Sequence, residues 1–241
     1  MRVDSYPHPP HSCELSGLTA VEVTWLASGR RLPAPTRRTS HPVTEYCAMS
    51  IKDELGNTCN RRVRLHLKSL GMPTVPEFTA LRNAQSVYGQ YGICMQFASG
   101  QSLPNAIDRS SQSLSLMNVD VGSCTMPQGM TQQQDALFGY GSRQSVGPND
   151  IICYWVDRVA SGGRQLAGCA SHPTAQPACV VAALGSPWTL AHEVGHVLGL
   201  RHTTGSAMLM STPTASITAR PPSISTADLA VIRASRLCVP C

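Results

Sequence analysis

Residues 192–202 decide the fold of this 241-residue chain, and they read His192-Glu193-Val194-Gly195-His196-Val197-Leu198-Gly199-Leu200-Arg201-His202. An α-helix turns about 100° per residue, so side chains four positions apart lie on one face. His192 and His196 have this spacing, and two imidazoles placed this way can bind a single metal ion. The segment therefore predicts a helix that carries a metal site.

The other polar positions of this segment complete a catalytic type of site. Glu193 projects beside the two histidines, where it can reach a water molecule on the metal and act as a general base. Gly199 lets the chain leave the helix in a left-handed conformation, which allows His202 to return as a third ligand. Three neutral nitrogens and one open position are typical of catalytic zinc, so the predicted cofactor is Zn2+.

The segment resembles the signature of the metzincin clan of zinc endopeptidases, HExxHxxGxxH. Every defined position is matched, by His192, Glu193, His196, Gly199 and His202. The clan also has a methionine turn below the metal, and here Ser206-Ala207-Met208-Leu209-Met210-Ser211 follows at a distance like that in the matrixin branch. The resemblance implies that Met210, or else Met208, occupies this turn. It also implies hydrolysis of protein or peptide substrates with Glu193 as general base.

The sequence departs from particular branches of the clan. No tyrosine follows the expected methionine turn, so the metal-proximal tyrosine of astacins and serralysins is not supported. The acidic and histidine clusters that bind structural calcium and zinc in matrixins are not evident. The latency motif of matrixins is also missing, although Cys13 or Cys47 could ligate the zinc in a latent form.

The fold class implied by the resemblance is α+β, with a mixed twisted sheet, an active-site helix, and a small C-terminal subdomain that holds the methionine turn and a terminal helix. Hydrophobic periodicity independently predicts elements in this order. Strands are expected at 63–67, 93–97, 114–119, 150–156 and 178–184. Helices are expected at 78–88, from Pro187 to Gly199 with Ser186 as N-cap, and at 226–236 after a Ser225 cap.

Composition suggests two parts. Residues 1–60 are rich in Pro, Arg, Ser and Thr, which is typical of an N-terminal extension or pro-segment. Residues 61–241 form the expected catalytic domain, with an upper subdomain at about 61–199 and a lower one at about 200–241. Around 166–171, a strand could offer an exposed edge to which an extended peptide adds.

Ten cysteines favour disulfides and an oxidising compartment, so we expect a secreted, periplasmic or otherwise extracellular protein. No signal peptide is visible, because Met1 and Arg2 precede a Pro-rich stretch rather than an apolar core. Cys169 with Cys179 is one candidate pair, and Cys47 with Cys59 is another. The spacing of the cysteines does not determine which of these or other pairs form.

Charge and hydropathy exclude other classes. The chain is 42% hydrophobic and 14% charged, which suits a folded core, and its net charge is only +5. Its basic residues are dispersed and 5% of its residues are aromatic, so nucleic-acid binding is not expected. Glu22, Arg158 and Glu193 interrupt the most apolar stretches, so no membrane span is expected either. The oligomeric state stays open.

A second reading of the sequence is a catalytically silent, disulfide-rich zinc-binding protein that recognises a partner. Such a protein does not need a general base, and a purely structural zinc site is normally closed by a fourth protein ligand. Because Glu193 is present, the sequence favours the enzyme.

Overall fold

Strand β3 (Arg61–Ser69) forms the centre of the main sheet in the computed structural model. Its residues alternate between two buried faces, because helices cover the sheet on both sides. Val63 and Leu65 point into one hydrophobic core, whereas His66 and Lys68 lie on the opposite face and are also buried. The structure describes residues 51–52, 55–103, 116–124, 130–171 and 177–241.

The main sheet is mixed, with strand order β11-β3-β6-β10-β9 and with β4 also paired to β3. Strands β3, β4, β6 and β10 run parallel to one another, whereas β11 runs antiparallel to β3, and β9 runs antiparallel to β10 and forms an edge of the sheet. The strands that join β3 in this sheet are β4 (Ile93–Ser102), β6 (Ile151–Val156), β9 (Gly168–Ser171), β10 (Ala178–Ala182) and β11 (Val239–Pro240).

Two smaller sheets flank the main one. The first pairs two short strands, β1 (Ile51–Lys52) and β2 (Thr58–Cys59). The second joins three strands in the order β5-β7-β8, namely β5 (Asn118–Asp120), β7 (Arg158–Ser161) and β8 (Arg164–Leu166).

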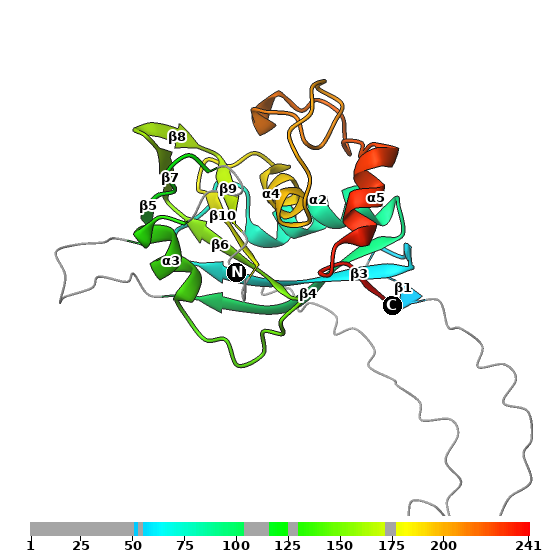
Figure 1. The fold of residues 1–241 in the computed structure, drawn as a ribbon, viewed down its shortest axis with the longest axis horizontal. Coiled ribbons are helices and arrows are strands. Elements are labelled where there is room, and N and C mark those ends of the chain that lie inside the picture. The colour runs from blue at the N-terminus through cyan, green and yellow to red at the C-terminus, as the bar shows by residue number, and fades with distance from the viewer. Residues whose placement is uncertain (1–50, 53–54, 104–115, 125–129, 172–176) are drawn as a thin grey trace, which may run out of the picture. The chain divides into compact units, whose positions relative to one another are not determined.

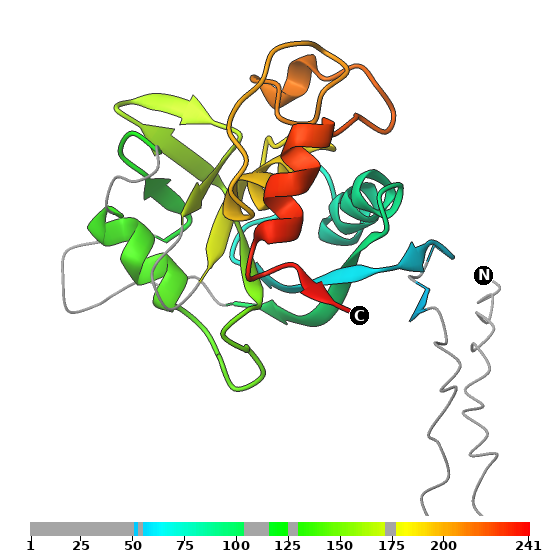
Figure 2. The same ribbon diagram turned by 45° about the vertical axis from the view of Figure 1, so that its right-hand side comes forward.

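Helices α2 (Glu77–Gly89) and α4 (Thr189–Val197) pack on one face of the main sheet, and α3 (Gln132–Gly139) packs on the other (Figure 1). The turned view shows α5 (Thr226–Ala234) beside the loop that follows α4 (Figure 2). A short 3-10 helix, η1 (Thr214–Ser216), lies within that loop. Among the described residues, no helix has both the length and the apolar character that crossing a membrane requires.

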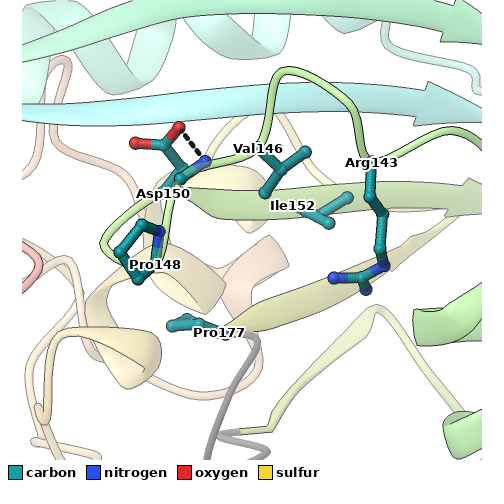
Figure 3. A pocket seen from close by; sticks show the side chains of 7 residues that line it. Arg143, Val146, Pro148, Asp150, Ile152 and Pro177 are labelled. Atoms are coloured by element: carbon teal, nitrogen blue, oxygen red, sulfur yellow. Dashed lines mark hydrogen bonds between the residues drawn. The ribbon is translucent and has the colours of Figure 1, made fainter.

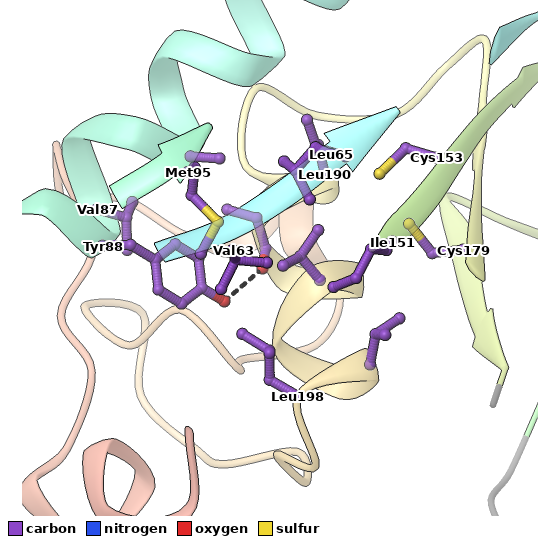
Figure 4. Close-up of a cluster of buried hydrophobic side chains, with 14 of the residues drawn as sticks. Val63, Leu65, Val87, Tyr88, Met95, Ile151, Cys153, Cys179, Leu190 and Leu198 are labelled. Atoms are coloured by element: carbon purple, nitrogen blue, oxygen red, sulfur yellow. Dashed lines mark hydrogen bonds between the residues drawn. The ribbon is translucent and has the colours of Figure 1, made fainter. Parts of the chain in front are cut away.

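The larger core joins α2, α4 and the main sheet (Figure 4). Tyr88 of α2 is fully buried there, and its hydroxyl donates a hydrogen bond of 2.9 Å to the carbonyl oxygen of Ala191 in α4. Leu190 and Leu198 of α4 pack in the same cluster as Val63. These contacts fix α4, the helix that carries His192 and His196, against the sheet.

A polar network crosses the opposite face of the sheet. Asp150 accepts hydrogen bonds from His66 Nε2 at 3.0 Å, from Arg64 Nη1 at 3.2 Å and from the Gly147 amide at 2.8 Å. Ser99 Oγ lies 2.7 Å from His66 Nδ1. The network provides partners for both ring nitrogens of His66, which would otherwise be costly to bury.

The observed elements confirm the α+β class and the mixed sheet. The helix of residues 192 and 196 begins at Thr189 rather than at Pro187, because the Thr189 amide bonds to the Ser186 carbonyl and closes a separate turn before the helix. Ser186 Oγ accepts a hydrogen bond from the Trp188 amide within that turn, and Thr189 Oγ1 accepts one from the Ser186 amide. Helix α3 and strands β7 and β8 lie in regions where the sequence predicts loop or turn.

The expected disulfide pairs are wrong. Cys59 bonds to Cys94, and Cys169 bonds to Cys124. Cys169 and Cys179 occupy neighbouring strands, but Cys169 faces the smaller core with α3, whereas Cys179 faces the larger core. Their sulfurs therefore lie on opposite sides of the sheet. Cys13 and Cys47 lie outside the described residues.

Candidate metal centre

The end of α4 sets the direction in which the chain returns to the metal site. The Gly199 amide bonds to the His196 carbonyl at 2.9 Å, and the Leu200 amide bonds to the Gly195 carbonyl at 2.9 Å. This pair of bonds is the Schellman ending, which needs a left-handed residue at the position of Gly199. Gly199 has a φ of 105°, so the sequence places glycine where a side chain would be strained.

Two backbone carbonyls orient the histidines of α4. His192 Nδ1 bonds to the carbonyl oxygen of Leu209 at 2.9 Å, and His196 Nδ1 bonds to that of Leu200 at 2.8 Å. A carbonyl oxygen only accepts, so both Nδ1 atoms carry the proton in the neutral ring. Each Nε2 atom is then left with a free lone pair, which is the form that binds a metal.

The three Nε2 atoms converge on one point. His196 Nε2 lies 3.1 Å from His192 Nε2 and 3.0 Å from His202 Nε2. Nitrogens bound tetrahedrally to zinc at about 2.0–2.1 Å are separated by about 3.3 Å, which is close to these distances. Facing lone pairs repel one another unless a cation lies between them. The three histidines therefore form a site that can hold one metal ion, and its ligand chemistry suits Zn2+.

Glu193 lies beside these ligands with its side chain almost completely buried, at 5% exposure. Its carboxylate has no hydrogen-bond or ion-pair partner among the described residues. A buried anion without a partner is unfavourable unless a cation or a bound water compensates it.

Burial governs the proton equilibria of the site. It raises the pKa of the Glu193 carboxyl to about 8 and lowers the pKa of His192 to about 3. Repulsion between the positive charges of His192 and His196 lowers the pKa of His192 further. Burial also lowers the pKa of His202. All three changes favour the neutral form, and for histidine the neutral form is the one that coordinates metal.

Met210 lies directly under α4. It is 2% exposed, and a Cβ atom added at Gly195 would lie 2.7 Å from its sulfur. The Thr203 amide bonds to the Met210 carbonyl at 3.0 Å, which connects the chain that follows His202 to residues 206–211. The absence of a side chain at Gly195 thus permits this close contact. Met208, the second choice from the sequence, is only partly buried.

A cleft of about 430 Å³ opens beside the histidines. Its lining includes His196 and His202, the basic side chain of Arg201, and Ala170 of edge strand β9. Cys124 also lines it, and through its disulfide to Cys169 it connects β9 to the segment after β5. The metal site is therefore open to solvent along a strand edge.

A second hollow lies away from the histidines, near the start of β6 and β10 (Figure 3). It has a volume of about 290 Å³, and Arg143 and Asp150 are its charged residues. Arg143 donates a hydrogen bond to the carbonyl oxygen of Phe138, and Asp150 belongs to the His66 network. Both charged groups thus have partners within the fold.

Comparison with known proteins adds evidence on the fold. The sequence matches no protein-family model and no curated protein. The structure resembles metalloproteinase-II from Bacteroides fragilis with a TM-score of 0.51 at 16% identity, over 76% of this chain. The likeness shows that the two proteins share a fold over the matched part. The chain spans only 55% of the length of that protein.

Archaemetzincins from Methanopyrus kandleri and Archaeoglobus fulgidus also match, with TM-scores of 0.47 and 0.41. Their identities to this chain are 14% and 13%, over 71% and 70% of its length, and the alignments cover 94% and 99% of the archaeal chains.

The structure brings together all the residues that the sequence selects, namely His192, Glu193, His196, Gly199, His202 and Met210. It also adds groups that the sequence does not reveal. The carbonyls of Leu200 and Leu209 leave no sequence signal, because every residue has one. Ala170 lies in the edge strand that the sequence predicts at about 166–171. Cys124 reaches the cleft through tertiary pairing, so no local pattern could identify it.

Proposed function

We propose that this protein is a zinc-dependent endopeptidase of the metzincin type, which hydrolyses peptide bonds in proteins. The observation that carries the proposal is the convergence of three Nε2 lone pairs beside an unpaired, buried carboxylate at an open cleft. A structural zinc site has no use for such a carboxylate, because it costs stability.

His192, His196 and His202 would hold the ion. When bound, Zn2+ supplies Lewis acidity, which lowers the pKa of water and polarises a substrate carbonyl. Glu193 accepts the proton of the attacking water at a carboxylate oxygen and then donates it to the leaving amine. Burial raises the pKa of the Glu193 carboxyl, so its carboxylate would hold an accepted proton more firmly than an exposed one, and a zinc ion in the site would favour the ionised form before the proton is accepted.

Strand β9 offers the binding edge for substrate. Among the described strands of the sheet it pairs with β10 alone, and Ala170 lines the cleft. An extended peptide can therefore add to β9 by backbone hydrogen bonds, which places its carbonyls beside the histidines. In this assignment the segment 206–211 is the methionine turn, with Met210 supporting α4 from below.

The two disulfides are compatible with an extracellular or periplasmic location. We propose that the protein works in such an oxidising compartment. Its physiological substrate would then be a protein exposed there.

The proposal is tested by incubating the purified protein with a mixed library of quenched peptides. Cleavage should stop on chelation and return with zinc. Glu193→Ala should retain zinc but lose about 10² to 10⁴ in rate. Asp135→Ala, which removes an exposed carboxylate on α3, is the matched control and should cleave normally.

Zinc-loaded protein that leaves the whole library intact would instead support the silent zinc-binding alternative. His196→Ala separates the two roles of the site, because it removes a ligand and should abolish metal retention. Loss of zinc from Glu193→Ala would contradict the role of Glu193 as a base that does not coordinate the ion.

A further inference from the structure

Gly168 is the first residue of edge strand β9, and it lies against Glu193 of α4. Its φ is outside the left-handed region, so its backbone conformation does not require glycine. What the position requires is space. An added Cβ atom at Gly168 would lie 2.8 Å from Cγ and 2.8 Å from Oε1 of Glu193.

The same Cβ atom would also lie 2.8 Å from the carbonyl oxygen of Val180 in β10. Strand β10 pairs with β6 on one side and with β9 on the other, so this carbonyl has little freedom to move. The Glu193 side chain has no bonding partner among the described residues. Of the two groups that the Cβ atom meets, the Glu193 side chain is therefore the one that can move, whereas the contact with the Val180 carbonyl is the same wherever Glu193 lies.

Strand β9 is itself held in place. Cys169, the next residue, is fully buried and bonded to Cys124, and the Ala182 amide bonds to the Ala167 carbonyl at 2.8 Å. The strand cannot easily retreat from α4 to make room for a side chain.

We infer that Gly168 is a positioning residue for the general base, because the empty space at its α-carbon sets where the Glu193 carboxylate lies. The inference rests on the proposed endopeptidase function for its kinetic consequence. The contact itself does not depend on that function.

The kinetic test compares Gly168→Ala with the wild-type protein. A carboxylate displaced by about 1 Å should lower kcat about a hundredfold, whereas KM and the bound zinc should change little. Gly139→Ala is the matched control, because an added Cβ atom there meets nothing within 4 Å and φ is ordinary. An unchanged kcat in Gly168→Ala, or a loss explained by missing zinc, would overturn the inference.

The second test needs no activity. Melting temperatures of the metal-free protein are measured for Gly168→Ala, Glu193→Ala and the double variant. If the new methyl group displaces Glu193, the drop in Tm caused by Gly168→Ala should be smaller in the Glu193→Ala background by about 3 °C, a shift typical of one such contact in a domain of this size.

If Gly168→Ala lowers Tm equally in the wild-type and Glu193→Ala backgrounds, the new methyl group does not displace Glu193, and the inference fails even if the protein cleaves peptides. Conversely, unequal drops in Tm in a protein that cleaves nothing would support the contact between Gly168 and Glu193, while the proposed function fails. The two claims can therefore fail separately.

Discussion

At the scale of single residues, the site depends on Gly199 as much as on the ligands. Its positive φ turns the chain so that the Leu200 carbonyl meets His196 Nδ1 and His202 reaches the other ligands. A Cβ atom there would be strained in this conformation and would lie 3.2 Å from Val231 of α5.

Gly199→Ala should therefore lower the free energy of unfolding by roughly 1–2 kcal/mol, the cost of a left-handed non-glycine residue. It should also weaken zinc binding, because His196 loses its fixed orientation. Denaturant unfolding and competition with a chelator measure the two effects. The prediction fails if Gly199→Ala behaves like Gly139→Ala in both assays.

At the scale of elements, the two disulfides have similar loops but different surroundings. Cys59–Cys94 spans 35 residues and Cys124–Cys169 spans 45, so loop-closure entropy assigns each about 4 kcal/mol. Only the second one connects to β9, the edge that borders the cleft.

Replacing Cys124 and Cys169 by serine should therefore lower both stability and peptide cleavage. The same replacement of Cys59 and Cys94 should lower stability alone. Comparing kcat/KM of the two double variants at a temperature where both are folded tests whether the Cys124–Cys169 disulfide affects cleavage separately from stability. Equal activities would show that the disulfide near the cleft does not hold the substrate edge.

The sequence predicts the elements whose residues alternate or recur regularly, such as β3, α2 and α5, and it predicts β6 from a continuous run of β-branched and aromatic residues. It fails for α3, where the hydrophobic pattern is weak and the only local signal is the capping box formed by Thr131 and Gln134. Disulfide pairing fails for another reason. Whether Cys169 and Cys179 face the same side of the sheet depends on the register of β9 and β10, which spacing does not encode.

The grouping of the three histidines was predictable, because His192 and His196 lie on one helix and His202 follows its end. The surroundings of Glu193 were not, because Gly168 is distant in sequence and reaches α4 only after β9 has paired with β10.

At the scale of the whole molecule, the buried tyrosines Tyr88 and Tyr154 should make the folded protein less stable at alkaline pH. Burial raises the pKa of Tyr154 to about 12 and also raises that of Tyr88. In the unfolded chain both ionise near pH 10. Because the folded pKa values are the higher ones, stability is complete below about pH 10 and is lost as the pH rises toward them.

Each tyrosine should contribute a loss of about 1.4 kcal/mol per pH unit above that point. Urea unfolding between about pH 9 and about pH 11 measures the slope, and Tyr154→Phe should make it shallower. A slope that Tyr154→Phe leaves unchanged would show that Tyr154 is not a source of the alkaline loss.

The proposal that His192, His196 and His202 bind zinc is tested most directly by X-ray absorption spectroscopy of the zinc-loaded protein. This measurement separates nitrogen ligands near 2.0–2.1 Å from sulfur ligands near 2.3 Å. The described part of the chain also offers four free cysteines, at 153, 179, 238 and 241, so sulfur is a real alternative. We predict one zinc per chain bound only by nitrogen and oxygen atoms, and no such signal in His196→Ala. Sulfur in the coordination sphere, or an unchanged spectrum in His196→Ala, would contradict the three-histidine site.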